Sequence, residues 1–249
     1  MTEGLPDGGD RRRVPHCGMT DTGNGRRTRE SYDAVAEEYA ARLGDELAAK
    51  PLDRALLAAL LEQGAQGAHG VQGAQEGAGD AAVRLVADLG CGPGHVADWL
   101  AGHGGVRAVG IDLSPEMVEV GRRSYPRVEF RVGDLRELPA ADGEFAAAVA
   151  FYSVIHLEAD GLRPAFDEMR RVLRPGGLLL LAFHAGTEVR HLDEWWGHGV
   201  DVDFRFLEPE RVAETLTTAG FAVEAQLERA SYPAEAETRR AYVLARRPE

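Results

Sequence analysis

Three glycines at alternate positions follow an aspartate in the first half of the chain. The residues are Asp88, Gly90, Gly92 and Gly94. An apolar run ends at Asp88 and helical spacing of apolar residues resumes at Val96, which predicts a strand, a glycine turn and a helix. Glycine permits positive φ and close approach of a ligand, and a helix N-terminus offers free N–H groups with a partial positive charge. The stretch can therefore bind a nucleotide; a tight turn without a ligand is the simpler alternative.

A second carboxylate ends the next predicted strand. Residues 106–111 form a short apolar run that ends in Asp112, near the distance at which a nucleotide-binding strand–helix–strand unit places its ribose-binding carboxylate. A dinucleotide fingerprint starting at Gly90 needs its third glycine where His95 stands. A nicotinamide-dependent oxidoreductase is therefore a disfavoured alternative.

Polar side chains also end the later predicted strands. The carboxyl ends of five strands supply Asp88, Asp112, Asp134, Tyr152 with Ser153, and His184. Ligands of open parallel sheets bind outside the carboxyl ends of the strands, near the point where the strand order reverses. These side chains are therefore expected to surround one site.

The elements that must position these side chains alternate between strand and helix. Strands are predicted at 85–88, 106–111, 127–132, 145–152 and 178–184, and the intervening helices include one capped by Ser114 and one at 162–173. The alternation implies a parallel sheet with right-handed crossovers. The tail differs, because a helix at 209–219 precedes a hairpin-like pair of strands at 221–228 and 241–246.

Composition narrows the class of protein. Among 249 residues 44% are apolar, and the net charge of −13 disfavours nucleic acid as a partner because phosphate binding relies on Lys and Arg. Cys17 and Cys91 form no disulfide framework, and the longest apolar run, 178–183, is too short to span a bilayer. A cytoplasmic protein without a membrane partner is expected. His191 and His198 have no third ligand at matching spacing, so no metal is expected.

Two segments are predicted to lie outside the folded core. Residues 1–28 lack periodicity and are expected to be a disordered leader, with translation starting at either Met1 or Met19. Residues 63–80 are a Gly/Ala/Gln-rich stretch, expected to be a flexible surface insertion. One domain is predicted over 29–249.

The motif from Asp88 to Gly94 resembles the first motif of the class I S-adenosylmethionine-dependent methyltransferases. The sequence SYDAVAEEYA from Ser31, the Leu-Arg-Pro-Gly-Gly segment at 173–177 and the Ala-Gly-Phe junction at 219–221 resemble members that act on small metabolites. The resemblance covers 31–247 apart from the insertion. It implies an α/β, Rossmann-like fold with a seven-stranded, mostly parallel sheet, helices on both faces and an antiparallel last strand.

The same resemblance implies a function. The cofactor would be S-adenosyl-L-methionine, with S-adenosyl-L-homocysteine as product, and the acceptor a small molecule whose accepting atom is O, N or C. The chain lacks the Asn/Asp-Pro-Pro-Tyr sequence of many nucleic-acid base methyltransferases, having Phe-Tyr-Ser-Val at 151–154. A catalytically inactive relative that binds the cofactor or a metabolite for regulation is the alternative. The oligomeric state is left open.

By resemblance, a set of residues would contact the cofactor. Asp112 would accept from the ribose hydroxyls, Asp134 from the adenine amino group beside the Leu135 backbone, and Tyr32 and Tyr39 would face the methionyl end from a covering helix. The two tyrosines can equally be the apolar stripe of a packing helix. The full expected set is Asp88, Gly90, Cys91, Gly92, Gly94, Asp112, Leu113, Asp134, Leu135, Tyr32 and Tyr39.

Two histidines are candidates for a general base. His156 follows the fourth predicted strand and His184 ends the fifth. A base is useful if the acceptor is a hydroxyl or a protonated amine. A structural role is the alternative for both. Trp195 and Trp196 are expected in a lid or wall over the acceptor.

Overall fold

The computed structural model describes residues 23–66, 84–233 and 235–249. The expected insertion lies outside these residues from 67 onward, and so do residues 1–22 of the expected leader. Helix α1 spans Gly23–Leu43 and therefore begins before residue 28, where the expected leader ends. Residues 23–28 lack an apolar stripe; they are held by tertiary bonds such as Asn24 Nδ2 donating to the His156 carbonyl at 2.9 Å.

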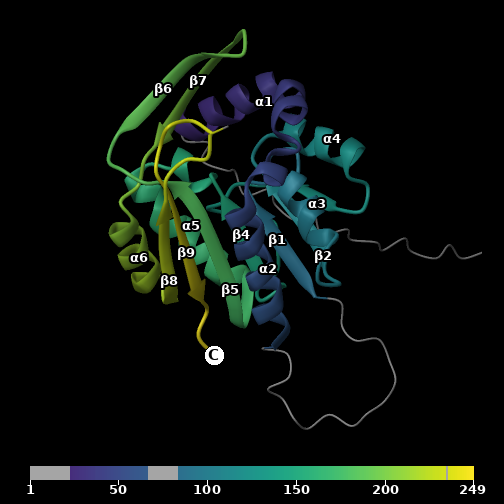
Figure 1. The fold of residues 1–249 in the computed structure, drawn as a ribbon, viewed down its shortest axis with the longest axis vertical. Helices are drawn as coiled ribbons and strands as arrows, with labels where there is room; N and C mark the ends of the chain where they lie inside the picture. Colours follow the sequence, from purple (N-terminus) through teal and green to yellow (C-terminus); the bar gives the residue numbers. More distant parts are fainter. Residues whose placement is uncertain (1–22, 67–83, 234) are drawn as a thin grey trace, which may run out of the picture.

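Seven strands form one sheet at the centre of the molecule (Figure 1). In sheet order they are β3 (Glu129–Val132), β2 (Arg107–Asp112), β1 (Leu85–Leu89), β4 (Phe145–Phe151), β5 (Leu173–His184), β9 (Arg240–Arg246) and β8 (Ala222–Arg229). Neighbours from β3 to β5 are parallel, whereas β9 is antiparallel to both β5 and β8. The expected fold class is confirmed.

Helices cover both faces of this sheet (Figure 1). One core holds the apolar sides of α5 (Ala159–Val172) and α6 (Pro209–Thr218), and the other holds those of α2 (Pro51–Gln66) and α3 (His95–Ala101). Helix α4 (Pro115–Ser124) begins as expected, because the Ser114 hydroxyl accepts from the Met117 N–H at 3.1 Å. Among the described residues, no helix is long and apolar enough to cross a membrane.

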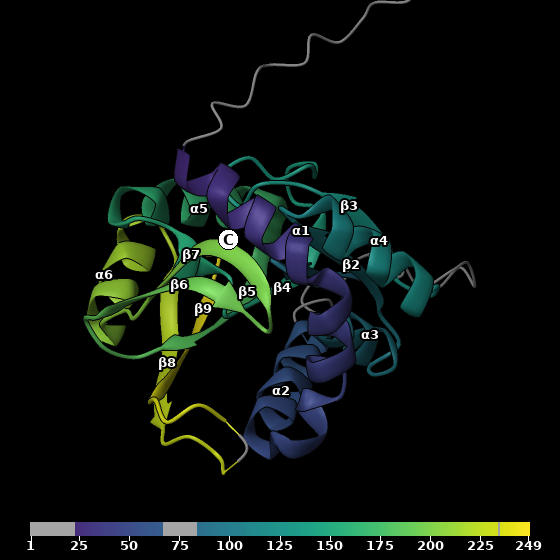
Figure 2. The same cartoon turned by 90° about the horizontal axis from the view of Figure 1, so that it is seen from above.

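A two-stranded hairpin stands apart from the main sheet and lies beside α1 in both views (Figure 1, Figure 2). It consists of β6 (Val189–Trp195) and β7 (His198–Arg205), in the segment expected to be a lid or wall. Ser31 on α1 accepts from the Asp201 N–H at 2.8 Å, and Arg27 pairs with the Asp201 carboxylate at 2.9 Å. The hairpin and α1 therefore form one covering layer.

Strand β5 starts earlier than expected. Leu173 already pairs with Phe145, and the next pair is Leu178 with Ala147, so residues 174–177 form an irregularity within the strand. Gly176 has φ of +75° there. The segment does follow the end of α5 as predicted, but it belongs to β5 and not to a loop before that strand.

The Phe130 ring of β3 fills a space that three glycines leave open. A Cβ at Gly94 would lie 2.4 Å from the ring, one at Gly110 2.9 Å and one at Gly121 2.6 Å. Gly94 also has φ of +93°, at the N-cap of α3. This ring therefore sets how closely α3 and α4 approach the sheet.

Gly94→Ala should destabilise the protein by about 2 to 5 kcal/mol, combining left-handed backbone strain with overpacking against Phe130. The matched control is Gly105→Ala: Gly105 has φ of +60° but nothing within 4 Å of its Cβ position. That control should lose only about 1 to 2 kcal/mol. Urea denaturation measures both; equal losses would show that contact with Phe130 contributes nothing.

Candidate functional site

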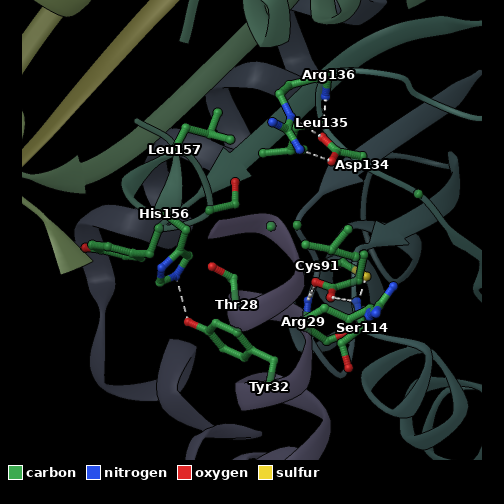
Figure 3. Close-up of a pocket in the computed structure, with 18 of the residues that line it drawn as sticks. Thr28, Arg29, Tyr32, Cys91, Ser114, Asp134, Leu135, Arg136, His156 and Leu157 are labelled. Atoms are coloured by element: carbon green, nitrogen blue, oxygen red, sulfur yellow. Dashed lines mark hydrogen bonds and ion pairs between the residues drawn. The ribbon is translucent and has the colours of Figure 1, made fainter. Parts of the chain in front are cut away.

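A cavity of about 280 Å³ lies at the carboxyl ends of β1, β2 and β4 and is covered by α1 (Figure 3). Most of the expected site residues line it: Tyr32, Tyr39, Asp88, Gly90, Cys91, Gly92, Asp112, Leu113, Asp134, Leu135 and His156. Gly94 and His184 are not among its lining residues. The structure thus brings together side chains from strand ends that are far apart in sequence.

The glycine turn after β1 is closely packed. The Gly90 and Cys91 N–H groups donate to the Ile111 carbonyl at 2.7 and 3.1 Å. Gly90 has φ of +75°, and a Cβ there would lie 2.1 Å from the Ser153 Cβ. Glycine is therefore required at this position, because any side chain would displace the turn that follows β4.

Asp112 is fixed by two backbone donors. Its Oδ2 accepts from the Gly92 N–H at 2.7 Å and its Oδ1 accepts from the Ser114 N–H at 2.9 Å. Burial raises the pKa of this carboxyl to about 6. Each carboxylate oxygen has a second lone pair, so the group can still accept from ligand hydroxyls.

Two buried polar atoms at the β1 end of the cavity lack a partner among the described residues. They are Oδ2 of Asp88, a residue only 2% exposed, and Nδ1 of His95. The other ring nitrogen of His95 lies 3.1 Å from Glu46 Oε1, so Glu46 fixes the ring. Buried polar atoms without partners are rare, and both residues line the cavity, which fits a polar ligand group at this end.

Sequence reasoning missed His95 and Glu46 as site residues. His95 entered only as the residue that breaks the dinucleotide spacing, although its place at the first position of α3 puts it beside the glycine turn. Glu46 belongs to a short 3₁₀ helix, η1 (Glu46–Ala49), and nothing in the local pattern marks it.

Asp134 at the opposite end of the cavity pairs with Arg136 (Figure 3). Its Oδ1 accepts from the Arg136 backbone N–H at 2.8 Å, and its Oδ2 from the guanidinium at 2.6 Å. Burial alone would raise the pKa of Asp134, but these bonds outweigh it and lower that pKa. The ion pair was not foreseen from the sequence.

Three carboxylates follow the order of the sheet. Asp134, Asp112 and Asp88 belong to the ends of β3, β2 and β1, which are neighbours in that order. All three line the same cavity. The cavity therefore presents acceptors at its two ends and between them.

Tyr32 and His156 form a hydrogen-bonded pair in the cavity (Figure 3). The Tyr32 hydroxyl lies 2.8 Å from His156 Nε2, and His156 Nδ1 lies 2.9 Å from the Asp203 backbone carbonyl. Burial lowers the pKa of His156 to about 4. The ring is therefore neutral at physiological pH.

An aromatic cluster supports the cavity from the side of the hairpin. Trp195 contacts both Tyr32 and Tyr39, with ring centroids at 5.6 and 5.8 Å, and Trp196 lies 6.1 Å from Tyr39. The tryptophans themselves do not line the cavity. The tryptophans lie behind Tyr32 and Tyr39, so the two tyrosines form this wall of the cavity instead of the tryptophans expected there.

His184 and His191 do not line the cavity. His184 Nδ1 lies 2.9 Å from the Thr238 hydroxyl and its ring stacks on Phe206, because β5 carries it toward β9 rather than toward the cavity. Its placement gives no support to the expected role as a base. His191 bonds the Asp203 carboxylate at 2.9 Å. Within the described ranges, no group of three or more metal-type ligands occurs.

Residues 86–177 match a family model described as a methyltransferase domain. Over 92 residues the chain is 37% identical to a demethylmenaquinone methyltransferase of Chlorobaculum parvum, a match that covers 37% of each protein. It is 36% identical over 103 residues to an O-methyltransferase of Penicillium expansum, covering 39% of this chain and 37% of the relative. The chain thus spans less than two fifths of these relatives' length.

A solved structure has the same fold over most of the chain. It is a TehB-like S-adenosylmethionine-dependent methyltransferase from Corynebacterium glutamicum, with a TM-score of 0.56 and 24% identity. The match covers 84% of this chain and 97% of that one. At this identity the likeness is one of fold.

The buried Asp88 predicts a pH dependence of stability. Burial raises its pKa from 3.8 to about 7, so between these values the folded state holds a proton that the unfolded state releases, and stability falls as pH rises. In Asp88→Asn, the decrease in the free energy of unfolding from pH 5 to pH 8 should be smaller by about 2 to 4 kcal/mol. Urea denaturation at pH 5 and pH 8 measures it. An unchanged pH slope, equal to that of the exposed control Asp142→Asn, would contradict the burial argument.

Proposed function

We propose that this chain belongs to the class I S-adenosylmethionine-dependent methyltransferases and transfers the methyl group of S-adenosylmethionine to a small molecule. The observation that carries the proposal is the order of Asp134, Asp112 and Asp88 along one cavity. The cofactor has an adenine amino group, ribose hydroxyls and a methionyl ammonium in the same order. Each is a hydrogen-bond donor that suits a carboxylate.

The cofactor would be held by the residues that line the cavity. Asp112 would accept from the ribose, and Asp134 with Leu135 would lie at the adenine. Asp88 Oδ2 would accept from the ammonium. His95 Nδ1 would meet the ammonium when its ring is neutral and the methionyl carboxylate when it is charged, so the two unpartnered atoms would both gain a partner.

When bound, S-adenosylmethionine supplies an electrophilic methyl group on a sulfonium. The protein's contribution is then mainly to hold an acceptor in line with that group, an effect that can provide ~7 to 11 kcal/mol. Helix α1 places Tyr32 and Tyr39 over the cavity, and the hairpin packs behind them. The two tyrosines and the hairpin behind them would keep water away from the reacting atoms.

Several observations support a small-molecule acceptor. The net charge of −13 disfavours nucleic acid, and four aromatic side chains line the cavity, namely Tyr32, Tyr39, Phe151 and Tyr152. The names of the relatives, a demethylmenaquinone methyltransferase and an O-methyltransferase, point the same way. With two cysteines in the chain, we also propose a reducing, cytoplasmic setting.

Isothermal titration with S-adenosylhomocysteine tests the cofactor assignment, with NAD as the competing ligand. Asp112→Asn should weaken S-adenosylhomocysteine binding about 10- to 100-fold, because hydrogen bonds to a charged group contribute about 1.5 to 3 kcal/mol each. Asp142→Asn should leave it unchanged. Binding of NAD and not of S-adenosylhomocysteine would overturn the proposal.

A second titration tests the methionyl end. Asp88→Asn should weaken S-adenosylhomocysteine about tenfold or more but hardly change the binding of methylthioadenosine, which lacks the ammonium and carboxylate. The ratio of the two dissociation constants isolates this contact from any general loosening of the site. Equal losses for the two ligands would remove Asp88 from the role of ammonium acceptor.

A further inference from the structure

The hydrogen bonds of His156 determine where its proton lies. The Asp203 carbonyl, 2.9 Å from Nδ1, can only accept, so Nδ1 carries the hydrogen. In a neutral ring Nε2 is then an acceptor, and the Tyr32 hydroxyl at 2.8 Å must donate to it. The hydroxyl oxygen of Tyr32 is left with lone pairs that can accept from a ligand.

Helix α1, the hairpin and the turn after β4 together fix this pair. His156 ends a short 3₁₀ helix, η3 (Val154–His156), its backbone carbonyl accepts from Asn24 of α1 and its ring is bonded to Asp203 of β7. Tyr32 is on α1, edge-on to Trp195 of the hairpin at 5.6 Å. The pair therefore has a defined geometry in a lined cavity, and the cofactor groups assigned above do not use it.

We infer that the methyl acceptor is a hydroxyl on an aromatic or enolic ring, with Tyr32 accepting its hydrogen bond and His156 receiving the proton. This inference rests on the methyl transfer proposed above. An amine is nucleophilic while neutral and needs no base at that stage, whereas a hydroxyl is a weak nucleophile that gains from proton removal. The buried Nε2 of His156, which carries no proton and lies behind the Tyr32 hydroxyl, therefore suits a hydroxyl acceptor better than an amine.

Methyl transfer to the hydroxyl would move one methyl group and two protons. The acceptor oxygen forms a bond to the methyl carbon while the carbon–sulfur bond breaks, and its electron pair goes to sulfur. The acceptor's proton passes to the Tyr32 oxygen, and the Tyr32 proton passes to His156 Nε2. Burial disfavours an imidazolium, but the sulfonium charge disappears as the imidazolium charge forms, so the cavity keeps its net charge. His156 later releases the proton to water.

Three probes of similar shape test the acceptor atom: para-cresol, para-nitrophenol and para-toluidine, each with S-adenosylmethionine. We expect methyl ethers from the two phenols and no methylated amine. Methylation of para-toluidine alone, or no methylation of either phenol by a protein that binds S-adenosylmethionine, would overturn the hydroxyl assignment and leave the cofactor assignment standing. Failure to bind S-adenosylmethionine would instead remove the proposed function.

Two variants test the proton path. Tyr32→Phe and His156→Gln should each lower kcat for para-cresol about 10²- to 10⁴-fold. The loss for para-nitrophenol should be below about tenfold, because this more acidic phenol ionises without help. A purely structural role would lower both rates equally and would overturn the path. Tyr125→Phe and His103→Gln, which alter a tyrosine and a histidine outside the cavity, are the matched controls.

A readout without turnover completes the test. In protein labelled with ¹⁵N-histidine, the signals lost in His156→Gln identify its ring nitrogens. We expect a neutral ring protonated at Nδ1, and a shift of the Nε2 signal in Tyr32→Phe. A ring protonated at Nε2 would mean that Tyr32 cannot donate to it, and the inference would fall.

Discussion

The Asp112 carboxylate joins two backbone turns, and the geometry of the cavity depends on it. One oxygen accepts from Gly92 in the turn after β1, and the other accepts from Ser114 in the turn after β2. These bonds keep a carboxylate ionisable despite burial, since burial alone disfavours the charge. Without them the glycine turn would be held to β2 only by the bonds of Gly90 and Cys91 to the Ile111 carbonyl.

The cover over the cavity depends on a second set of polar bonds. Helix α1 is joined to the hairpin through Ser31 and Arg27, and to η3 through Asn24. The hairpin is also joined to η3, because the Asp203 carbonyl of β7 bonds to His156 Nδ1. Because His156 contacts both parts of the cover, the position of its ring depends on whether both are in place. The position of the His156 ring is thus linked to the position of the cover.

Local patterns in the sequence predicted the sheet, its direction and the glycine turn, because alternation of apolar runs, glycine and capping residues is a short-range signal. Such patterns do not predict contacts between residues that are far apart in the sequence. Tyr32 and His156 are 124 residues apart, and Glu46 and His95 are 49 apart. The start of α1 at Gly23 and the two strands of the hairpin were missed for the same reason, since tertiary contacts rather than an apolar stripe stabilise them.

Strand order also has a consequence for how the chain folds during synthesis. Strand β9 lies between β5 and β8, both of which precede it in the chain. Until β9 leaves the ribosome, β5 has an unpaired edge, and β8 has no neighbour in the sheet. An unpaired apolar edge can pair with another chain, so the nascent protein is exposed to aggregation in that interval. The insertion of β9 between β5 and β8 therefore leaves the edge of β5 open until residues 240–246 have been made.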